Sequence, residues 1–311
     1  MATVPRTAPA GPKPRRRARK LTRTDKIVLS VMVGIPAALH VALVWVPTLG
    51  SIALSFSRWE GVGGFDTIQW IRTLNYRQIF TIYPPFWPAV RHNVIWLAFL
   101  FLATGFGLFL AVQLDKRLRM TRFYQSIIFL PVMLSLAIVG FIWHLVYAHD
   151  DGLLNNLLGT HVDWLGNSNI NLWAALVAAG WRHVGYIMVI YLAGLKSLDP
   201  SLGEAAAIDG ANEWQTFRRV VFPALKPINV VVLVITAIES LRAFDLVYVI
   251  NKGTNGLELV SVLVTNNIIG EASRIGYGSA LAVILLVVSL VFIIPYLVVY
   301  FRGSFSAKGV R

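Results

Sequence analysis

Long apolar stretches recur along the chain, with polar connections between them. Each is close to the roughly 20 residues that a helix needs to cross a bilayer. The second stretch, VIWLAFLFLATGFGLFLAVQL, holds no charged residue. The pattern predicts an all-α membrane protein with six transmembrane helices, near residues 28–49, 94–114, 123–147, 172–195, 228–250 and 279–301.

Composition agrees with this pattern. Of the 311 residues, 56% are hydrophobic and 14% are charged, whereas soluble proteins carry about 25% charged residues. Cysteine is absent, which excludes disulfides and thiolate chemistry. No phosphate-binding loop and no histidine–glutamate pattern with zinc-binding spacing is found, so we expect no enzymatic site, no metal and no cofactor in this chain.

The positive charges predict the orientation. With the N-terminus in the cytoplasm, inner segments hold twenty Lys and Arg residues and outer loops hold six. This bias predicts that both termini are cytoplasmic. We expect a disordered basic tail at 1–26, a six-helix membrane domain at 27–303 and a short tail at 304–311. The tail either determines topology or contacts anionic lipids. Basic residues that flank spans do not form a nucleic-acid groove.

The connection 198–227 has helix signals that are unusual for a loop. Asp199 suits an N-cap position and Pro200 the first helical turn. Gly210 can adopt the left-handed conformation that ends a helix. Asn212 and Gln215 have capping-box spacing, so a second helix is predicted to begin there.

An apolar stripe follows on this second helix. Trp214, Phe217, Val220 and Val221 share one face, and Pro223 is expected to end the helix. The stripe must be covered by the lipid interface, by the protein's own helix ends, or by a groove in a separate cytoplasmic protein. Periodicity does not choose among these three.

The same residues resemble a known motif. Glu204-Ala205-Ala206, three residues, Gly210, nine residues and VVFP ending at Pro223 are similar to the "EAA" loop of permease subunits in binding-protein-dependent ABC importers. The family pattern ends in Ile-x-Leu-Pro, so two aliphatic positions differ.

Other segments extend the resemblance over most of the chain. FLPVMLSLAIVGFIW (129–143), DGLLNNLLG (151–159) and AFDLVYVIN (243–251) resemble the carbohydrate branch of the family. The long outer loop after the first span resembles the maltose-type first permease subunit. KGTNG (252–256) departs from the Gly-Gly-Pro turn that is common in the branch.

The resemblance implies a transport subunit without an ATPase site in a bacterial cytoplasmic membrane. It implies partnership with a second permease, ATP-binding subunits that hold ATP and Mg, an extracytoplasmic solute-binding protein and a sugar-type substrate. The residues that it assigns to contact with the ATPase are Glu204, Ala205, Ala206, Asp209, Gly210, Trp214, Phe217 and Pro223. The alternative is a self-sufficient, ion-coupled secondary transporter, for which intramembrane carboxylates exist.

Charged residues inside spans cost about 2.5–3.5 kcal/mol each at the bilayer centre, so they usually face a cavity. A solute pathway needs hydroxyl-matching polar groups and aromatic rings. The candidates are Trp181, Tyr186, Glu239, Arg242 and Asp245, with Arg182 and His183 beside them in the fourth span. An internal Glu239–Arg242 ion pair that fastens helices remains the alternative. We expect His144 and Trp143 to be packing residues.

Overall fold

The computed structural model describes residues 22–116, 119–270 and 273–306. This part of the chain is helical apart from a hairpin of two very short antiparallel strands, in which Ser57 pairs with Trp70. The elements are α1 (Arg23–His40), the π-helix η1 (Val41–Trp45), α2 (Val46–Leu54), β1 (Ser57–Arg58), the 3₁₀ helix η2 (Phe65–Thr67), β2 (Gln69–Trp70), α3 (Leu74–Thr81), α4 (Phe86–Asp115), α5 (Thr121–Phe129), the 3₁₀ helix η3 (Leu130–Met133), α6 (Leu136–Val146), α7 (Leu153–Leu158), α8 (Asn171–Lys196), α9 (Ser201–Ile208), α10 (Glu213–Thr216), the π-helix η4 (Phe217–Val221), α11 (Phe222–Ala224), α12 (Lys226–Leu241), α13 (Asp245–Asn251), α14 (Val260–Ile268) and α15 (Ile275–Ser306).

The predicted class, an all-helical membrane protein, is confirmed. Four helices of the described residues are long and apolar enough to cross a membrane: Arg23–Leu54, Phe86–Asp115, Asn171–Lys196 and Ile275–Pro295. Two bent helix pairs raise the number of candidate spans to six if each pair counts as one span. The orientation of the termini stays a prediction.

The first span belongs, up to Gly50, to a separate compact unit. Its helix begins at Arg23 because Thr22 and Asp25 form a capping box, so part of the predicted basic tail is helical. Residues 1–21 and 307–311, which hold most of both predicted tails, lie outside the described residues. Within this first unit the helix buries none of its side chains.

The third span is not the single helix predicted at 123–147. Thr121–Met133 and Leu136–Val146 meet at an angle of 100°. Pro131 lies in the tight η3 turn, and Leu134 and Ser135 are extended. The Ser135 hydroxyl then accepts a hydrogen bond from the backbone of Ile138, so a new helix begins at the corner.

The fifth span, predicted as one helix at 228–250, is interrupted at residues 242–244. No glycine or proline causes the break. The carbonyl of Ala243, which a break leaves without its helical partner, accepts a hydrogen bond from the Ser261 hydroxyl at 2.5 Å. A distant residue therefore satisfies the interrupted backbone, as buried polar groups require.

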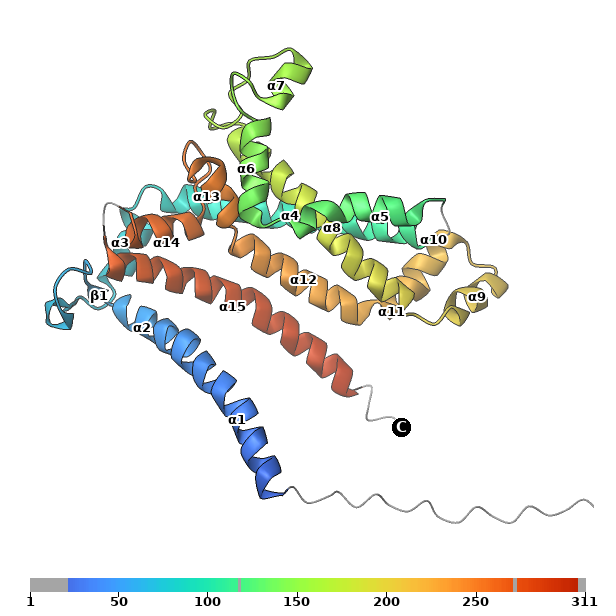
Figure 1. The fold of residues 1–311 in the computed structure, drawn as a ribbon, viewed down its shortest axis with the longest axis horizontal. Coiled ribbons are helices and arrows are strands. Elements are labelled where there is room, and N and C mark those ends of the chain that lie inside the picture. Colours follow the sequence, from blue (N-terminus) through green and yellow to red (C-terminus); the bar gives the residue numbers. More distant parts are fainter. Residues whose placement is uncertain (1–21, 117–118, 271–272, 307–311) are drawn as a thin grey trace, which may run out of the picture. The chain divides into compact units, whose positions relative to one another are not determined.

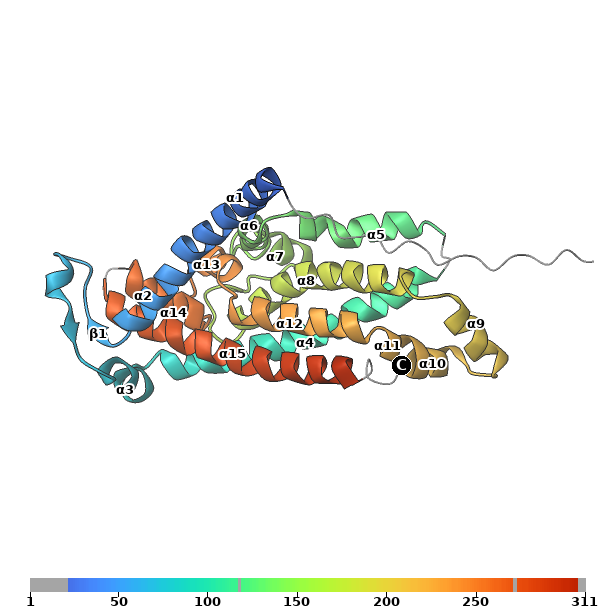
Figure 2. The ribbon, with the colours of Figure 1, turned by 90° about the horizontal axis from the view of Figure 1, so that it is seen from below.

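The core of the second unit, which begins at Ser51, is built on α4, α8 and α12, which lie side by side in Figures 1 and 2. Close approach depends on glycine. A Cβ atom added at Gly107 would lie 3.0 Å from the Cβ of Ile187 and 3.0 Å from the carbonyl oxygen of Val184. Small residues at such points let membrane helices pack at short range.

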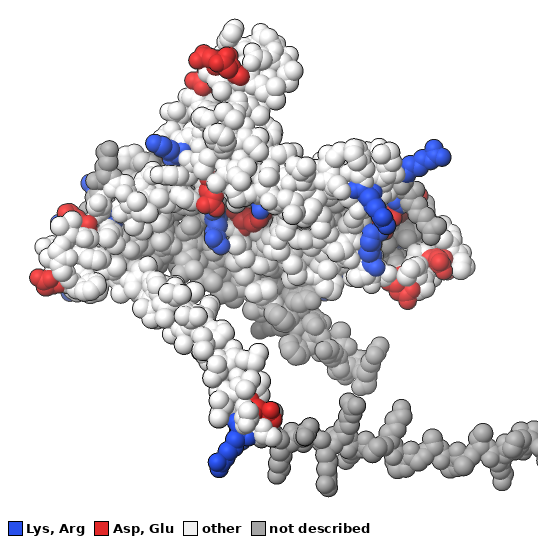
Figure 3. All heavy atoms as spheres, viewed as in Figure 1, with Lys and Arg blue, Asp and Glu red and all other residues white. Residues whose placement is uncertain are grey.

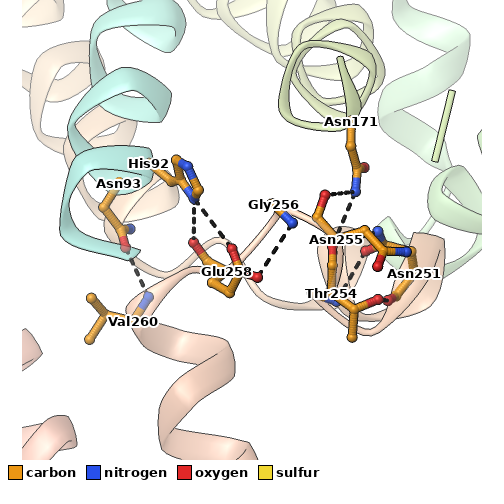
Figure 4. A network of polar contacts seen from close by, with 10 residues as sticks. His92, Asn93, Asn171, Asn251, Thr254, Asn255, Gly256, Glu258 and Val260 are labelled. Atoms are coloured by element: carbon orange, nitrogen blue, oxygen red, sulfur yellow. Dashed lines mark hydrogen bonds and ion pairs between the residues drawn. The ribbon is translucent and has the colours of Figure 1, made fainter. Parts of the chain in front are cut away.

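The loop between α13 and α14 is held rigidly by side chains from other helices (Figure 4). The amide of Asn171 donates to the carbonyls of Thr254 and Asn255, both at 3.1 Å. The backbone of Val260 donates to Asn93 at 2.9 Å. Thus the KGTNG segment, which departs from the family's turn, is bound to α8 through the Asn171 side chain.

Gly185→Ala tests the helix packing. A Cβ at Gly185 would collide with the Ile128 carbonyl oxygen of α5, and backbone cannot move aside as a side chain tip can. We expect a loss of about 1–3 kcal/mol, seen as a lower thermal unfolding midpoint of the purified protein in detergent. Gly105→Ala, with nothing near its Cβ position, is the matched control. Equal midpoints for the two variants would contradict this packing.

Candidate functional site

A cavity of about 210 Å³ lies where α12 meets the break before α13. Figure 3 shows a small group of acidic and basic side chains near this junction, on a face that is otherwise largely uncharged. Glu239, Arg242 and Asp245, three of the candidate pathway residues, all line the cavity. The other lining residues are Trp96, Leu100, Leu136, Ala179, Arg182, His183, Ile238, Ala243, Phe244 and Leu246.

The Glu239 carboxylate is oriented by two residues of α8. His183 Nδ1 lies 2.9 Å from Glu239 Oε2, and Arg182 Nη1 lies 3.7 Å from Oε1. The His183 side chain is only 3% exposed, whereas that of Glu239 is 32% exposed. The carboxylate is therefore held by α8 on one side and is open to the cavity on the other.

The polar network continues behind His183. Its Nε2 lies 3.0 Å from the Thr104 hydroxyl of α4, which lies 3.0 Å from the Thr236 hydroxyl of α12. Thr104, Thr236 and His183 are all buried. Three helices are thereby joined by one line of hydrogen bonds that ends at Glu239.

The structure contradicts the alternative of a Glu239–Arg242 ion pair and pairs Glu239 with residues of α8 instead. Among the described residues Glu239 is paired with Arg182 and His183, while Arg242 is exposed. Both oxygens of the Glu239 carboxylate already face partners on α8, and Arg242 is the C-cap residue of α12.

Two predicted pathway residues lie elsewhere. Trp181 packs edge-on against Trp143, with ring centroids 5.8 Å apart, and lines a separate apolar groove of about 930 Å³. Tyr186 packs against the apolar cluster around Ile187. Trp143 packs against the core, as expected, and His144 Nδ1 contacts the carbonyl of Ile250 at 2.8 Å.

The structure places Arg182 and His183 in the cavity wall, whereas sequence reasoning missed Thr104 and Thr236. A signal existed for His183, a titratable residue in the middle of an apolar run. Threonine in a membrane helix carries little signal, because its hydroxyl can also bond to its own backbone. Only the fold shows that these side chains meet.

The first half of the 198–227 segment forms the predicted bend. The carboxylate of Asp199 accepts a hydrogen bond from the Ser201 backbone at 2.9 Å, which lowers the Asp199 pKa. Pro200 takes the N-cap position itself, one residue later than expected. Gly210 has φ +77°, and the backbone of Ala211 donates to the Ala206 carbonyl at 3.0 Å. These are the marks of a Schellman motif.

The second half differs from expectation in one respect. Asn212 and Gln215 form the predicted capping box, but Pro223 does not end the helix. The helix passes through the π-turn η4 and continues to Ala224. Because the wide turn precedes Pro223, the proline ring and its missing N–H are accommodated, and the bend of 75° comes after Ala224 instead.

The apolar stripe faces the protein's own α4 across a groove. Trp214, Phe217 and Val221 line this groove of about 760 Å³ opposite Leu108 and Phe109. Trp214 nevertheless remains 66% exposed.

The outer surface of the segment has a different composition. Glu204, Ala205, Asp209 and Gly210 are exposed, and Ala206 is buried. Ile208 is 87% exposed. The bend therefore presents one apolar side chain between acidic residues.

Two ion pairs tie the segment's surroundings together. Lys116 at the end of α4 contacts Glu213 at 2.8 Å, and Lys196 at the end of α8 contacts Asp115 at 3.4 Å. Exposed pairs of this kind add little stability because water screens them, so they orient the segment more than they stabilise it.

Comparison with known proteins identifies the family. Residues 103–305, more than half of the chain, match the family model "Binding-protein-dependent transport system inner membrane component". A probable ABC transporter permease protein of Pyrococcus horikoshii is 30% identical over 91% of this chain and 99% of its own length. The xylose/arabinose import permease protein XacH of Haloferax volcanii is 34% identical over 85% of each chain.

A solved structure shares the fold. A chain of a bacterial ABC transporter involved in the import of the polysaccharide alginate has a TM-score of 0.76 at 20% identity, and the match covers 90% of this chain and 96% of that one. Family membership decides against a self-sufficient secondary transporter, and the family is the membrane component of its importer, not the ATPase. The chain belongs to the permease family of binding-protein-dependent ABC importers and is a multi-pass membrane protein.

Proposed function

We propose that this permease forms half of a translocation pathway for a sugar or a related neutral solute, with a second permease as the other half. Its N- and C-termini face the cytoplasm of a bacterial cell, and its substrate is delivered by an extracytoplasmic solute-binding protein. The observation that carries the substrate class is the cavity at the break of the fifth span. The xylose/arabinose relative supports a carbohydrate.

The cavity suits polyhydroxylated solutes chemically. It offers carboxylates and guanidinium groups, which accept from and donate to hydroxyls, beside the rings of Trp96 and Phe244. Two acidic and two basic residues balance its formal charge. A discontinuous membrane helix at a solute site is also the arrangement that lets backbone groups line a cavity. Glu239, Arg242 and Asp245 are thus the proposed contacts.

The 198–227 segment is the proposed contact with a cytoplasmic ATPase. Its bend at Gly210 exposes Glu204, Asp209 and the apolar Ile208, which together offer a small apolar anchor within a charged rim. Trp214 and Phe217 would transmit the contact to the membrane helices, because they line the groove between this segment and α4. Movement of a bound ATPase would then press on α4 and α8.

Gly210→Val tests the coupling role. Valine is strained at φ +77° by about 1 kcal/mol or more, so the bend should shift and ATP hydrolysis should no longer drive uptake. The measurement is sugar uptake and ATPase activity of the whole importer in proteoliposomes. Gly159→Val is the control, since Gly159 has φ +63° and equally open surroundings but lies in another loop. Normal uptake with Gly210→Val would rule the role out.

Glu239→Gln tests the pathway. The amide keeps the size of the side chain but replaces one hydroxyl acceptor with a donor, so the concentration for half-maximal uptake should rise roughly tenfold or more, as expected for about 1.4 kcal/mol or more of lost interaction. Uptake of labelled arabinose, xylose, maltose and trehalose by the complete importer gives the readout. Trp181→Phe, outside the cavity, should leave uptake unchanged. An unaltered value for Glu239→Gln would exclude this cavity as the solute site.

A further inference from the structure

A buried histidine is the closest partner of the carboxylate in the cavity. His183 is 2% exposed, lies inside a membrane-spanning helix and uses both ring nitrogens. Arg182, the formal counter-ion, is 3.7 Å from Glu239 and so beyond hydrogen-bonding distance. His183 at 2.9 Å therefore has more influence than Arg182 on the orientation of the carboxylate.

The direction of the hydrogen bonds at the His183 ring follows from chemistry. An ionised carboxylate only accepts, so Nδ1 of His183 donates to Glu239. Nε2 of the neutral ring then accepts, and the Thr104 hydroxyl can donate to it. The Thr236 hydroxyl can in turn donate to Thr104. The Thr236 hydroxyl also lies 3.4 Å from Nε2, so either threonine can be the donor to the ring.

We propose that His183 is a positioning residue for solute recognition: it holds the Glu239 carboxylate in one orientation on the cavity wall and is itself held by Thr104 and Thr236. This rests on the proposed function of the cavity as the solute pathway. A fixed acceptor loses less conformational freedom when it binds a hydroxyl, so preorganisation raises affinity. Because the network spans α4, α8 and α12, helix movement changes the orientation of the carboxylate.

A thiol in the cavity can report the field of the carboxylate without any transport. The chain has no native cysteine, so Ala243→Cys, in the cavity wall, is a single reporter. Membranes that hold the whole importer are treated with a trimethylammonium or a sulfonate methanethiosulfonate, and labelling of this chain is followed by mass. The labelling rate with the cationic reagent is divided by the rate with the anionic reagent. Accessibility of the thiol affects both rates alike, so their ratio reports the local electrostatic potential.

Four variants in the Ala243→Cys background decide the question. Glu239→Gln should lower the rate ratio on the order of tenfold, because a unit charge near the thiol is lost. His183→Ala should lower it severalfold, since the freed carboxylate turns away. His183→Asn, whose amide N–H replaces Nδ1–H, should restore most of the ratio. His144→Ala removes a histidine that also ties helices but lies outside the cavity lining, so it should keep the parent ratio.

The outcomes separate the two proposals. A ratio for His183→Ala equal to the parent's, beside a lowered ratio for Glu239→Gln, would overturn the positioning role. A lowered ratio that His183→Asn fails to restore would mean that His183 only supports packing, and would overturn it too. The labelling result does not depend on uptake, so unaltered uptake in Glu239→Gln would remove the solute pathway while leaving the geometry established.

Discussion

Close packing of α4 against α8 is the constraint on which the rest of the molecule depends. Gly107 of α4 allows the backbone of α8 to approach, since the Val184 carbonyl lies 3.0 Å from the Cβ position of Gly107, and at that short distance the Thr104 hydroxyl reaches His183. Lipid gives no hydrophobic advantage to helix association in a membrane, so shape and polar contacts must supply it. The same packing therefore stabilises the bundle and brings the polar groups of the cavity together.

Local signals in the sequence predicted the local structure well. Gly210, Asn212 and Gln215 specify their own caps, because each bonds to a backbone or side-chain group within a few residues. The six apolar runs likewise identified every candidate span. The roles assigned to Glu204 and its neighbours are not of this kind, since they concern a surface that another protein must cover. They remain predictions.

Features that depend on distant contacts could not be predicted. The break before α13 has no glycine or proline and relies on Ser261, which is 18 residues away. The partners of Glu239 likewise come from α8, another helix, and not from Arg242 three residues further along the chain. Trp181 was misplaced for the same reason. The helical repeat tells which side chains share a face of one helix, but it does not tell which neighbouring helix that face contacts.

One helix joins the two candidate sites. Thr104 and Lys116 both lie on α4, twelve residues and therefore about 18 Å apart along its axis. Lys116 contacts Glu213 of the 198–227 segment, and Thr104 contacts the network that orients Glu239. The side chains between them line the groove that Trp214 and Phe217 face. A displacement of the segment must therefore either move α4 as a body or open that groove. If α4 moves, the hydrogen bonds at Thr104 change length, and the acceptor on the cavity wall changes with them. The geometry thus gives a contact at the segment a direct mechanical route to the proposed solute site.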